Sequence, residues 1–208
     1  DRRQRQMCIR DSDRRYRGFT TLREAITDSI NIVTVKTLAQ AGVSLGWQYV
    51  QEYGFTTVDS RDMNEALALG GITQGVSNLE LTAAYAAIAN QGTYIKPKFY
   101  TKILDHDGNV LIDNTTPESH TVIKDTTAWL LTSAMEDVMT SGTGTSAYFG
   151  SSMAQAGKSG TTTSSRDALF AGYTPYYTCA VWGGYDDNAM QKGSDTNLSL
   201  IHISEPTR

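Results

Sequence analysis

Apolar residues recur at helical spacing along the first part of the chain. This pattern predicts a short helix over residues 22–29, capped by Thr20 or Thr21, and a second helix from Asn31 to a stop at Gly42. A third helix is expected over residues 45–53, because Gly54 follows it as a stop signal.

A capping box marks the next helix. Ser77 precedes Glu80 by three positions, and an apolar stripe follows until Asn90 and Gly92. A surface hairpin is expected where residues 99–104 and 110–112 flank a turn that contains Gly108. Another helix is predicted to begin with Asp125 as its cap and to end at residues 141–142.

The last third of the chain is rich in Thr, Tyr, Val and Trp. Segments 154–163, 168–173 and 177–185 are predicted as three neighbouring antiparallel strands, because the connections between them are short. Helices followed by a run of strands indicate an α+β fold, with an antiparallel sheet packed against helices.

Composition narrows the possible functions. The chain has 208 residues, a net charge of −4 and 39% hydrophobic residues, which fits one domain of ordinary size or two small ones. No clustered basic stripe indicates nucleic-acid binding, so no nucleic-acid partner is expected, and Trp129, Trp182 and the tyrosines are assigned to core and strand packing. No apolar run reaches the eighteen residues of a membrane span, and Cys8 and Cys179 alone make no disulfide framework.

No metal or cofactor site is expected from the residue pattern. His106 and His120 stand in polar contexts without a cysteine or carboxylate at ligand spacing, so both are assigned to surface loops. Asp186 and Asp187 lack the spaced oxygen series of a calcium loop and are interpreted as part of a solvated turn.

Two catalytic motifs are present in outline only. Residues 42–46 match the Gly-x-Ser-x-Gly elbow, but that motif needs a strand entering the turn, whereas a helix is predicted here. Residues 157–159 resemble the end of a phosphate-binding loop, but Ser152 occupies the position of its first glycine and a strand follows instead of a helix.

Two other motifs fit their predicted surroundings. Ser29-Ile30-Asn31 lies between two helices, and Lys158-Ser159-Gly160-Thr161 lies on a strand. Serine enzymes that interact with penicillin use a polar S-x-N element and a K-[ST]-G strand in their active sites. Each motif alone also has a structural explanation, because Ser29 could cap a helix end and Lys158 could be a solvated strand lysine.

The wider sequence decides between these explanations. From about Asp13 to Asp187 the chain resembles the C-terminal part of the transpeptidase domain of class A penicillin-binding proteins, the bifunctional cell-wall synthases. The resemblance rests on the order and spacing of six segments: TLREAITDSINIV, ALGGITQGVSNLELTAAYAAIANQGTYIKPKF, ILDHDGNVL, TSGTGTSAY, AGKSGTTTSSRDALFAGYTP and AVWGGYDDN.

The resemblance implies a catalytic pair. A serine nucleophile attacks D-alanyl-D-alanine, D-alanine leaves, and an amine of another stem peptide takes the acyl group. Ser29 is expected to relay a proton between the lysine of the nucleophile motif, the leaving amine and Lys158. Asn31 is expected to hold the peptide amide of the substrate. Lys158 is expected to lie near the substrate carboxylate and to favour the neutral form of the nucleophile's lysine.

The same resemblance implies a binding strand. Ser159 and Thr161 would offer hydroxyls to the substrate carboxylate, and Gly160 would let the substrate lie against the backbone. The backbone N–H of Thr161 would form half of the oxyanion hole.

The resemblance also implies that this chain is a fragment. No serine in it is followed three residues later by lysine, so the Ser-x-x-Lys nucleophile is expected upstream and the chain alone is expected to be inactive. A glycosyltransferase domain and membrane anchor would precede residue 13, and a closing helix would follow about Asn188. Residues 1–12 and 198–208 resemble translated sequencing adaptors, which leaves 13–197 as the partial domain.

The expected partners are peptidoglycan stem peptides, the lipid-linked precursor and β-lactam antibiotics, at the extracytoplasmic face of the bacterial membrane. The alternatives are a β-lactamase or D,D-carboxypeptidase fragment, a non-catalytic penicillin-sensor domain and a catalytically inactive structural homologue. The segment ALGGITQGVSNLELTAAY and the long stretch between Asn31 and Lys158 favour the synthase.

Overall fold

The computed structural model describes residues 18–162 and 166–191, together with the backbone of residues 5–8. Its α-helices are α1 (Leu22–Thr27), α2 (Asn31–Ala41), α3 (Val43–Glu52), α4 (Asn78–Ala89) and α5 (Asp125–Thr140). Short 3-10 helices are η2 (Ser60–Asp62), η3 (Glu65–Leu69) and η4 (Thr145–Ala147). The strands are β1 (Arg5–Cys8), β2 (Gly18–Thr21), β3 (Thr93–Ile95), β4 (Lys102–Leu104), β5 (Val110–Asp113), β6 (Ser119–Thr121), β7 (Ala156–Thr161), β8 (Asp167–Tyr173) and β9 (Thr178–Gly184).

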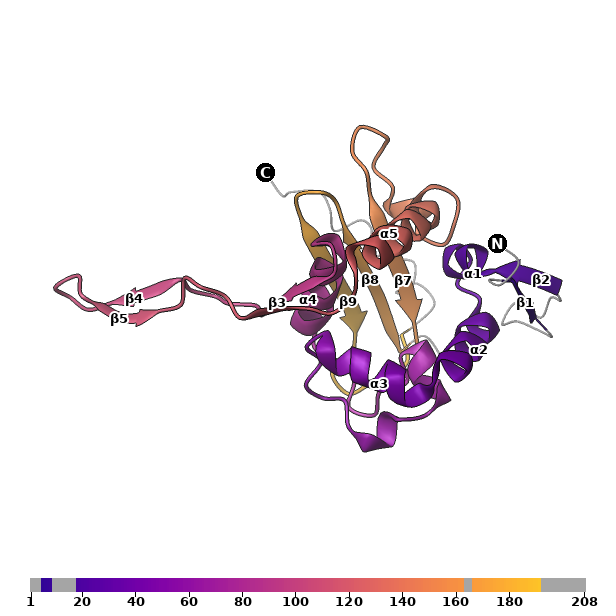
Figure 1. Ribbon diagram of the computed structural model, residues 1–208, viewed down its shortest axis with the longest axis horizontal. Coiled ribbons are helices and arrows are strands. Elements are labelled where there is room, and N and C mark those ends of the chain that lie inside the picture. The colour runs from indigo at the N-terminus through magenta and orange to yellow at the C-terminus, as the bar shows by residue number, and fades with distance from the viewer. Residues whose placement is uncertain (1–4, 9–17, 163–165, 192–208) are drawn as a thin grey trace.

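The three strands β7, β8 and β9 form the largest sheet in the described part of the chain. They pair antiparallel in that order, with Lys158 opposite Ala171 and Ala171 opposite Ala180. Helices α4 and α5 pack against this sheet (Figure 1), and Met135 of α5 meets Ala156 and Tyr173 in its core. The predicted α+β class and the antiparallel order of these strands are confirmed.

The first helix is shorter than predicted. Thr21 caps α1 and forms a capping box with Glu24, which settles the choice between the two candidate threonines. The helix ends at Thr27 rather than at residue 29, and Ser29 adopts φ +58° outside it. A left-handed residue cannot continue a right-handed helix, so the chain changes direction before α2 begins.

Gly42 separates α2 from α3 as predicted, with φ +105°. Helix α3 begins at Val43, two residues earlier than expected, and Ser44 therefore lies inside it. A helix enters this glycine and another helix leaves it, which is incompatible with the strand-turn-helix geometry of a nucleophile elbow.

Capping explains the remaining long helices. The Ser77 hydroxyl accepts from the Glu80 N–H and the Glu80 carboxylate accepts from the Ser77 N–H, so the predicted capping box of α4 is confirmed. The predicted cap of α5 is wrong by one residue. Lys124 is the N-cap, and Asp125 is the first helical residue. The Asp125 carboxylate accepts from the Thr126 N–H, and its negative charge near the positive end of the helix dipole stabilises the helix.

The predicted hairpin is present as β4 and β5, joined by a turn in which the Asp105 carboxylate accepts from the N–H groups of Asp107 and Asn109. It extends away from the main body as a long arm (Figure 1). A short ladder between β3 and β6, which the sequence analysis did not predict, lies where this arm joins the body.

Strand β1 pairs with β2, although the sequence analysis expected no element within residues 1–12. The tail assigned to residues 198–208 lies outside the described residues, as does the predicted end of the first sheet strand at Thr163. Within the described ranges, no helix combines the length and the apolar character that a bilayer crossing requires.

The assignment of aromatic residues to the core is wrong at several positions. Trp129 is 68% exposed on the first turns of α5, and Tyr177 is 81% exposed in the turn between β8 and β9. The helical spacing of Trp129 fits its position in α5 but does not determine which face of that helix meets the sheet. Trp182 of β9 is also 42% exposed, and its indole N–H donates to the Asp167 carboxylate of β8.

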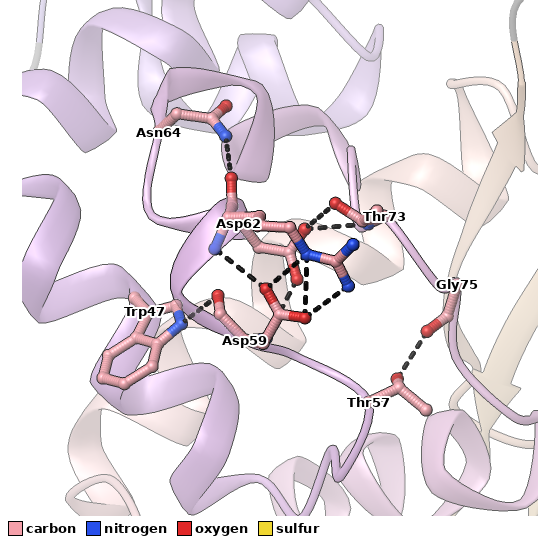
Figure 2. Close-up of polar contacts among 8 residues, drawn as sticks. Trp47, Thr57, Asp59, Asp62, Asn64, Thr73 and Gly75 are labelled. Atoms are coloured by element: carbon pink, nitrogen blue, oxygen red, sulfur yellow. Dashed lines mark hydrogen bonds and ion pairs between the residues drawn. The ribbon is translucent and has the colours of Figure 1, made fainter.

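A buried carboxylate organises the connection between α3 and α4. Asp62 is 1% exposed and accepts from the backbone N–H and the hydroxyl of Thr73, and from the Asp59 N–H. These hydrogen bonds hold the pKa of Asp62 below its usual range. Figure 2 shows how they join the segment around Asp59 to the segment that leads into α4, while Trp47 of α3 donates to the Asp59 carbonyl. The connection is therefore ordered although it contains little regular structure.

Candidate active site

The two motifs separated by most of the chain meet through their side chains. The Lys158 Nζ lies 2.9 Å from the Ser29 Oγ and donates a hydrogen bond to it. The same Nζ donates to the Ser159 carbonyl oxygen at 2.9 Å. An ammonium has three N–H donors. Two of them are used by these contacts, and no group among the described residues accepts the third, which can bind an incoming anion.

Ser29 is held by the tight turn between α1 and α2. The Ser29 N–H donates to the Ile26 carbonyl, and the Ile30 N–H donates to the Ala25 carbonyl at 2.8 Å. Ile30 is completely buried and packs with Ala25 and Val33. Burial of Ile30 anchors the turn, which holds the polar Ser29 in a left-handed conformation that L-residues rarely adopt.

Lys158 is held by the sheet. Its backbone pairs with Ala171 of β8, and its side chain is partly buried between β7 and the turn that carries Ser29. Burial lowers the pKa of the Lys158 ammonium below its usual value. An amine with a lowered pKa gives up its proton more readily than a solvated lysine, and Ser29 lies at hydrogen-bond distance to take part in such a transfer.

Helix α5 fixes the turn relative to the sheet. Arg23 of α1 donates to the Ser133 carbonyl at 3.0 Å and pairs with the Asp137 carboxylate. Helix α5 packs on both α1 and β7. The distance between Ser29 and Lys158 is therefore set by the way that two elements pack on a third.

The edge of the sheet next to Lys158 is open. Thr162 donates its N–H to the Asp167 carbonyl at 3.0 Å, so these two residues form a hydrogen-bonded pair. Such pairs alternate with non-bonded pairs in an antiparallel ladder, so the N–H of Thr161 points away from β8. It faces the side of β7 on which no strand of the described residues pairs. This is the orientation that the predicted oxyanion role requires.

Gly160 and Asn31 complete the predicted set. Gly160 is exposed, and a Cβ added there would meet only the Leu169 Cβ at 3.8 Å, so the surface above this glycine is free. Asn31 is the first residue of α2 and is exposed. Within the described residues no hydrogen bond connects its side chain to Ser29 or Lys158. The structure thus brings Ser29, Lys158 and Ser159 into one hydrogen-bonded group and leaves Asn31 beside it.

One further residue joins the group. The Ser159 hydroxyl donates to the Thr143 Oγ1 at 2.9 Å, and Thr143 lies in the turn after α5. This turn belongs to the segment TSGTGTSAY, which contributes to the family resemblance but gives Thr143 no predicted role. A single threonine between glycines carries no local signal that distinguishes it from an ordinary turn residue.

No metal site is apparent among residues 18–162 and 166–191, where no three His, Cys, Asp or Glu side chains gather. His120 is exposed and its Nε2 lies 2.8 Å from the Glu52 carbonyl, while its ring packs on Tyr94. A cavity of about 300 Å³ lies between α3 and β6 and contains none of the predicted site residues.

Residues 3–197 match the family described as the penicillin binding protein transpeptidase domain. The chain belongs to this family. The resemblance on which the sequence analysis relied is therefore confirmed. The match includes residues 3–12, which were set apart as a tail, and the origin of that tail stays a prediction.

The relatives of this transpeptidase domain are class A penicillin-binding proteins. The chain is 40% identical over 202 residues to penicillin-binding protein 1F of Bacillus subtilis, covering 94% of this chain and 27% of that protein. It is 37% identical over 193 residues to penicillin-binding protein 1A of Clostridium perfringens, covering 89% of this chain and 28% of that protein. The chain thus spans about a quarter of the length of these relatives.

Solved structures agree with this membership. Penicillin-binding protein 1A from Haemophilus influenzae superposes with a TM-score of 0.77 at 25% identity, over 96% of this chain and 37% of that chain. PonA1 from Mycobacterium tuberculosis superposes with a TM-score of 0.74 at 24% identity, over 90% of this chain and 53% of that chain. The second similarity supports the fold of the transpeptidase domain alone.

Proposed function

We propose that this chain is the part of a peptidoglycan D,D-transpeptidase that carries the S-x-N and K-S-G elements of its active site. The observation that supports this most directly is the hydrogen bond between Lys158 and Ser29, which joins two motifs 129 residues apart. A solvated strand lysine and a helix-end cap, the structural alternatives for these residues, have no reason to meet. Family membership supports acyl transfer as the reaction class, and the contact supports proton transfer between Lys158 and Ser29.

The reaction is an acyl transfer from D-alanyl-D-alanine to an amine of a second stem peptide. A serine hydroxyl attacks the penultimate carbonyl carbon, and its proton passes to a base as the tetrahedral intermediate forms. The C–N bond then breaks, and the nitrogen of D-alanine takes a proton as it leaves. Ser29 can deliver that proton and regain one from Lys158, because a hydroxyl both donates and accepts. The amine of the acceptor attacks the acyl-enzyme in the reverse sense and restores the serine.

The negative charge of the intermediate would be stabilised at the open edge of β7. The N–H of Thr161 points away from β8 and can donate to the oxyanion. The Lys158 ammonium places a positive charge beside the same strand, where the substrate's terminal carboxylate would lie with Ser159 and Thr161. Asn31 is proposed to hold the peptide amide, and Gly160 leaves room for the substrate backbone.

The nucleophile of this proposal lies outside the chain. We propose that a Ser-x-x-Lys segment, a glycosyltransferase domain and a membrane anchor belong to the same protein, as the fraction of the relatives' length that is covered suggests. The transpeptidase would then act outside the cytoplasmic membrane on stem peptides of the lipid-linked precursor, and β-lactams would acylate it. PonA1 of Mycobacterium tuberculosis has been solved in complex with penicillin V.

Labelling with a tagged penicillin tests the proposal. This chain alone should form no covalent adduct, because it lacks Ser-x-x-Lys. A protein extended by its upstream coding sequence should be acylated, and Ser29→Ala or Lys158→Met should slow acylation by about 100-fold or more, the usual contribution of proton transfer. Lys102→Met, an exposed lysine on the β4–β5 hairpin, is the matched control and should leave the rate unchanged.

Each alternative function gives a different result. An adduct on this chain would refute the absence of the nucleophile, and a normal rate in both site variants would refute the proposed roles. Rapid release of hydrolysed penicillin would favour a β-lactamase. Release of D-alanine without formation of cross-linked product would favour a carboxypeptidase, and acylation without either turnover reaction would favour a sensor domain.

A further inference from the structure

The turn that follows α5 reaches both halves of the site. In residues 141–144, the Thr143 N–H donates to the Thr27 carbonyl at the end of α1, and the Gly144 N–H donates to the Val138 carbonyl at 3.0 Å. The Thr143 side chain accepts from Ser159 on β7. One residue therefore contacts the helix that precedes Ser29 and the strand that carries Lys158.

This close approach depends on a glycine. A Cβ added to Gly142 would lie 2.3 Å from the Thr27 carbonyl oxygen and 2.9 Å from the Val138 Cα, which are both backbone atoms. No other residue could occupy position 142 without moving α1 away from the end of α5. The position of Thr143 is thus fixed by the backbone on both sides, which is what a preorganised binding group requires.

The hydrogen bond between the Ser159 and Thr143 hydroxyls leaves one hydroxyl proton without an acceptor among the described residues. Ser159 uses its only hydroxyl proton to donate to the Thr143 oxygen. The Thr143 hydroxyl has one proton of its own, and within the described residues its side chain has no acceptor for that proton. Thr143 is exposed. An exposed donor held by the residue that follows Lys158 on β7 is suited to an anionic oxygen supplied by a ligand.

We propose that Thr143 is a ligand-binding residue that donates its hydroxyl proton to the terminal carboxylate of the bound peptide. This inference rests on the proposed function, since it assigns a further donor to the same site. In this arrangement Ser159 does not contact the carboxylate itself, and its donated hydrogen bond polarises the Thr143 hydroxyl toward the ligand. The carboxylate is then bound directly by the Lys158 ammonium and the Thr143 hydroxyl, and Ser159 acts through Thr143.

Binding of two short peptides to the 208-residue chain tests this proposal. The probes are N-acetyl-D-alanyl-D-alanine and its C-terminal amide, titrated into the isotope-labelled chain and followed by NMR. Thr143→Val removes the hydroxyl at nearly constant volume and should raise the Kd of the acid about tenfold, since a hydrogen bond to a charged group contributes that much. The Kd of the amide should change less than about twofold, because the amide lacks the charge.

Two further variants separate binding from structure. Thr143→Ser keeps the hydroxyl and should bind the acid within about threefold of the wild type. Thr140→Val changes a threonine of α5 whose hydroxyl donates to the Glu136 carbonyl, and should bind both probes normally.

The possible outcomes are distinct. An equal loss of acid and amide binding in Thr143→Val, or no loss of either, overturns the carboxylate role of Thr143 and leaves the proposed function standing. A wild-type chain that binds neither probe at millimolar concentration counts against the proposed function itself, and the role of Thr143 falls with it. Selective loss for the acid, with recovery in Thr143→Ser, supports the proposal.

Discussion

The left-handed backbone at Ser29 makes a prediction about stability that two substitutions can separate. Ser29→Ala removes the hydroxyl but keeps the Cβ that disfavours φ +58°. Ser29→Gly removes both. The two variants therefore lose the same contact with Lys158 and differ only in backbone strain and in the freedom of the unfolded chain.

The magnitudes follow from these terms. Loss of a hydrogen bond from a charged donor costs about 1.5–3 kcal/mol, so Ser29→Ala should be destabilised by about that amount. A left-handed conformation costs an L-residue about 1–2 kcal/mol, and glycine loses about 0.4–1 kcal/mol through greater unfolded-state entropy. Ser29→Gly should therefore be more stable than Ser29→Ala by about 0.8 kcal/mol.

Urea unfolding measures this difference. With an m-value of about 2 kcal/mol/M, the midpoint of Ser29→Gly should lie about 0.4 M above that of Ser29→Ala. Ser133 provides the control, since it lies in the middle of α5 and both substitutions there lose the same contact with Arg23. In a helix interior the order should reverse, with glycine about 1 kcal/mol less stable than alanine.

A result in the wrong order would refute the reasoning. If Ser29→Gly unfolds at lower urea than Ser29→Ala, the turn between α1 and α2 does not hold residue 29 in the left-handed region. If the same order is found at both positions, the difference reflects glycine in general and carries no information about the turn. Only opposite signs at Ser29 and Ser133 support the backbone account.

Two other predictions concern the same site. Gly142→Ala should destabilise the chain by about 1–3 kcal/mol in urea unfolding, since the added Cβ has no room beside Thr27. Gly160→Ala should be neutral or stabilising by about 0.5 kcal/mol, because the space around Gly160 is open. Equal effects of the two substitutions would contradict the packing argument. The pKa of Lys158 is lowered by burial below the usual 10.5, so the folded state binds fewer protons and stability should rise with pH up to about that value. Lys158→Met should lack this rise. Burial raises the pKa of Tyr85 to about 12, which makes stability fall with pH in both proteins. This contribution cancels when the unfolding free energy of Lys158→Met is subtracted from that of the wild type at each pH. If the difference in unfolding free energy between the wild type and Lys158→Met does not vary with pH, the pKa of Lys158 is not lowered in the folded state.

Much of the fold was predictable because its signals are local. The capping box at Ser77 and Glu80 defines the start of α4 within four residues, and short connections leave β7, β8 and β9 little choice but to pair as neighbours. The β3–β6 ladder was missed for the opposite reason. Each strand has three residues, and their partners are separated by the whole hairpin arm, so neither has a periodicity to detect.

The members of the site were predictable, and the family resemblance also implied that Ser29 and Lys158 meet. The S-x-N and K-S-G patterns identify Ser29 and Lys158, but their contact depends on packing between distant elements. The φ of Ser29 could not be read from its sequence, since serine has no preference for the left-handed region, and the predicted helix ran through it. The exposure of Trp129 was not predicted, because the helical period of apolar residues does not show which face of α5 packs against the sheet.

Helix α5 is the element on which the arrangement depends. Its Asp137 pairs with Arg23 of α1, its Met135 packs on Ala156 of β7, and the turn after it carries Thr143. Each of the three contacts lies at a different height along α5, so a shift of this helix would change the Ser29–Lys158 distance and the position of Thr143 together. A proton can move between two groups only within hydrogen-bond reach, and a displacement of about 1 Å costs much of the rate. The packing of α5 therefore acts on the chemistry of the site although only the turn that follows the helix touches it.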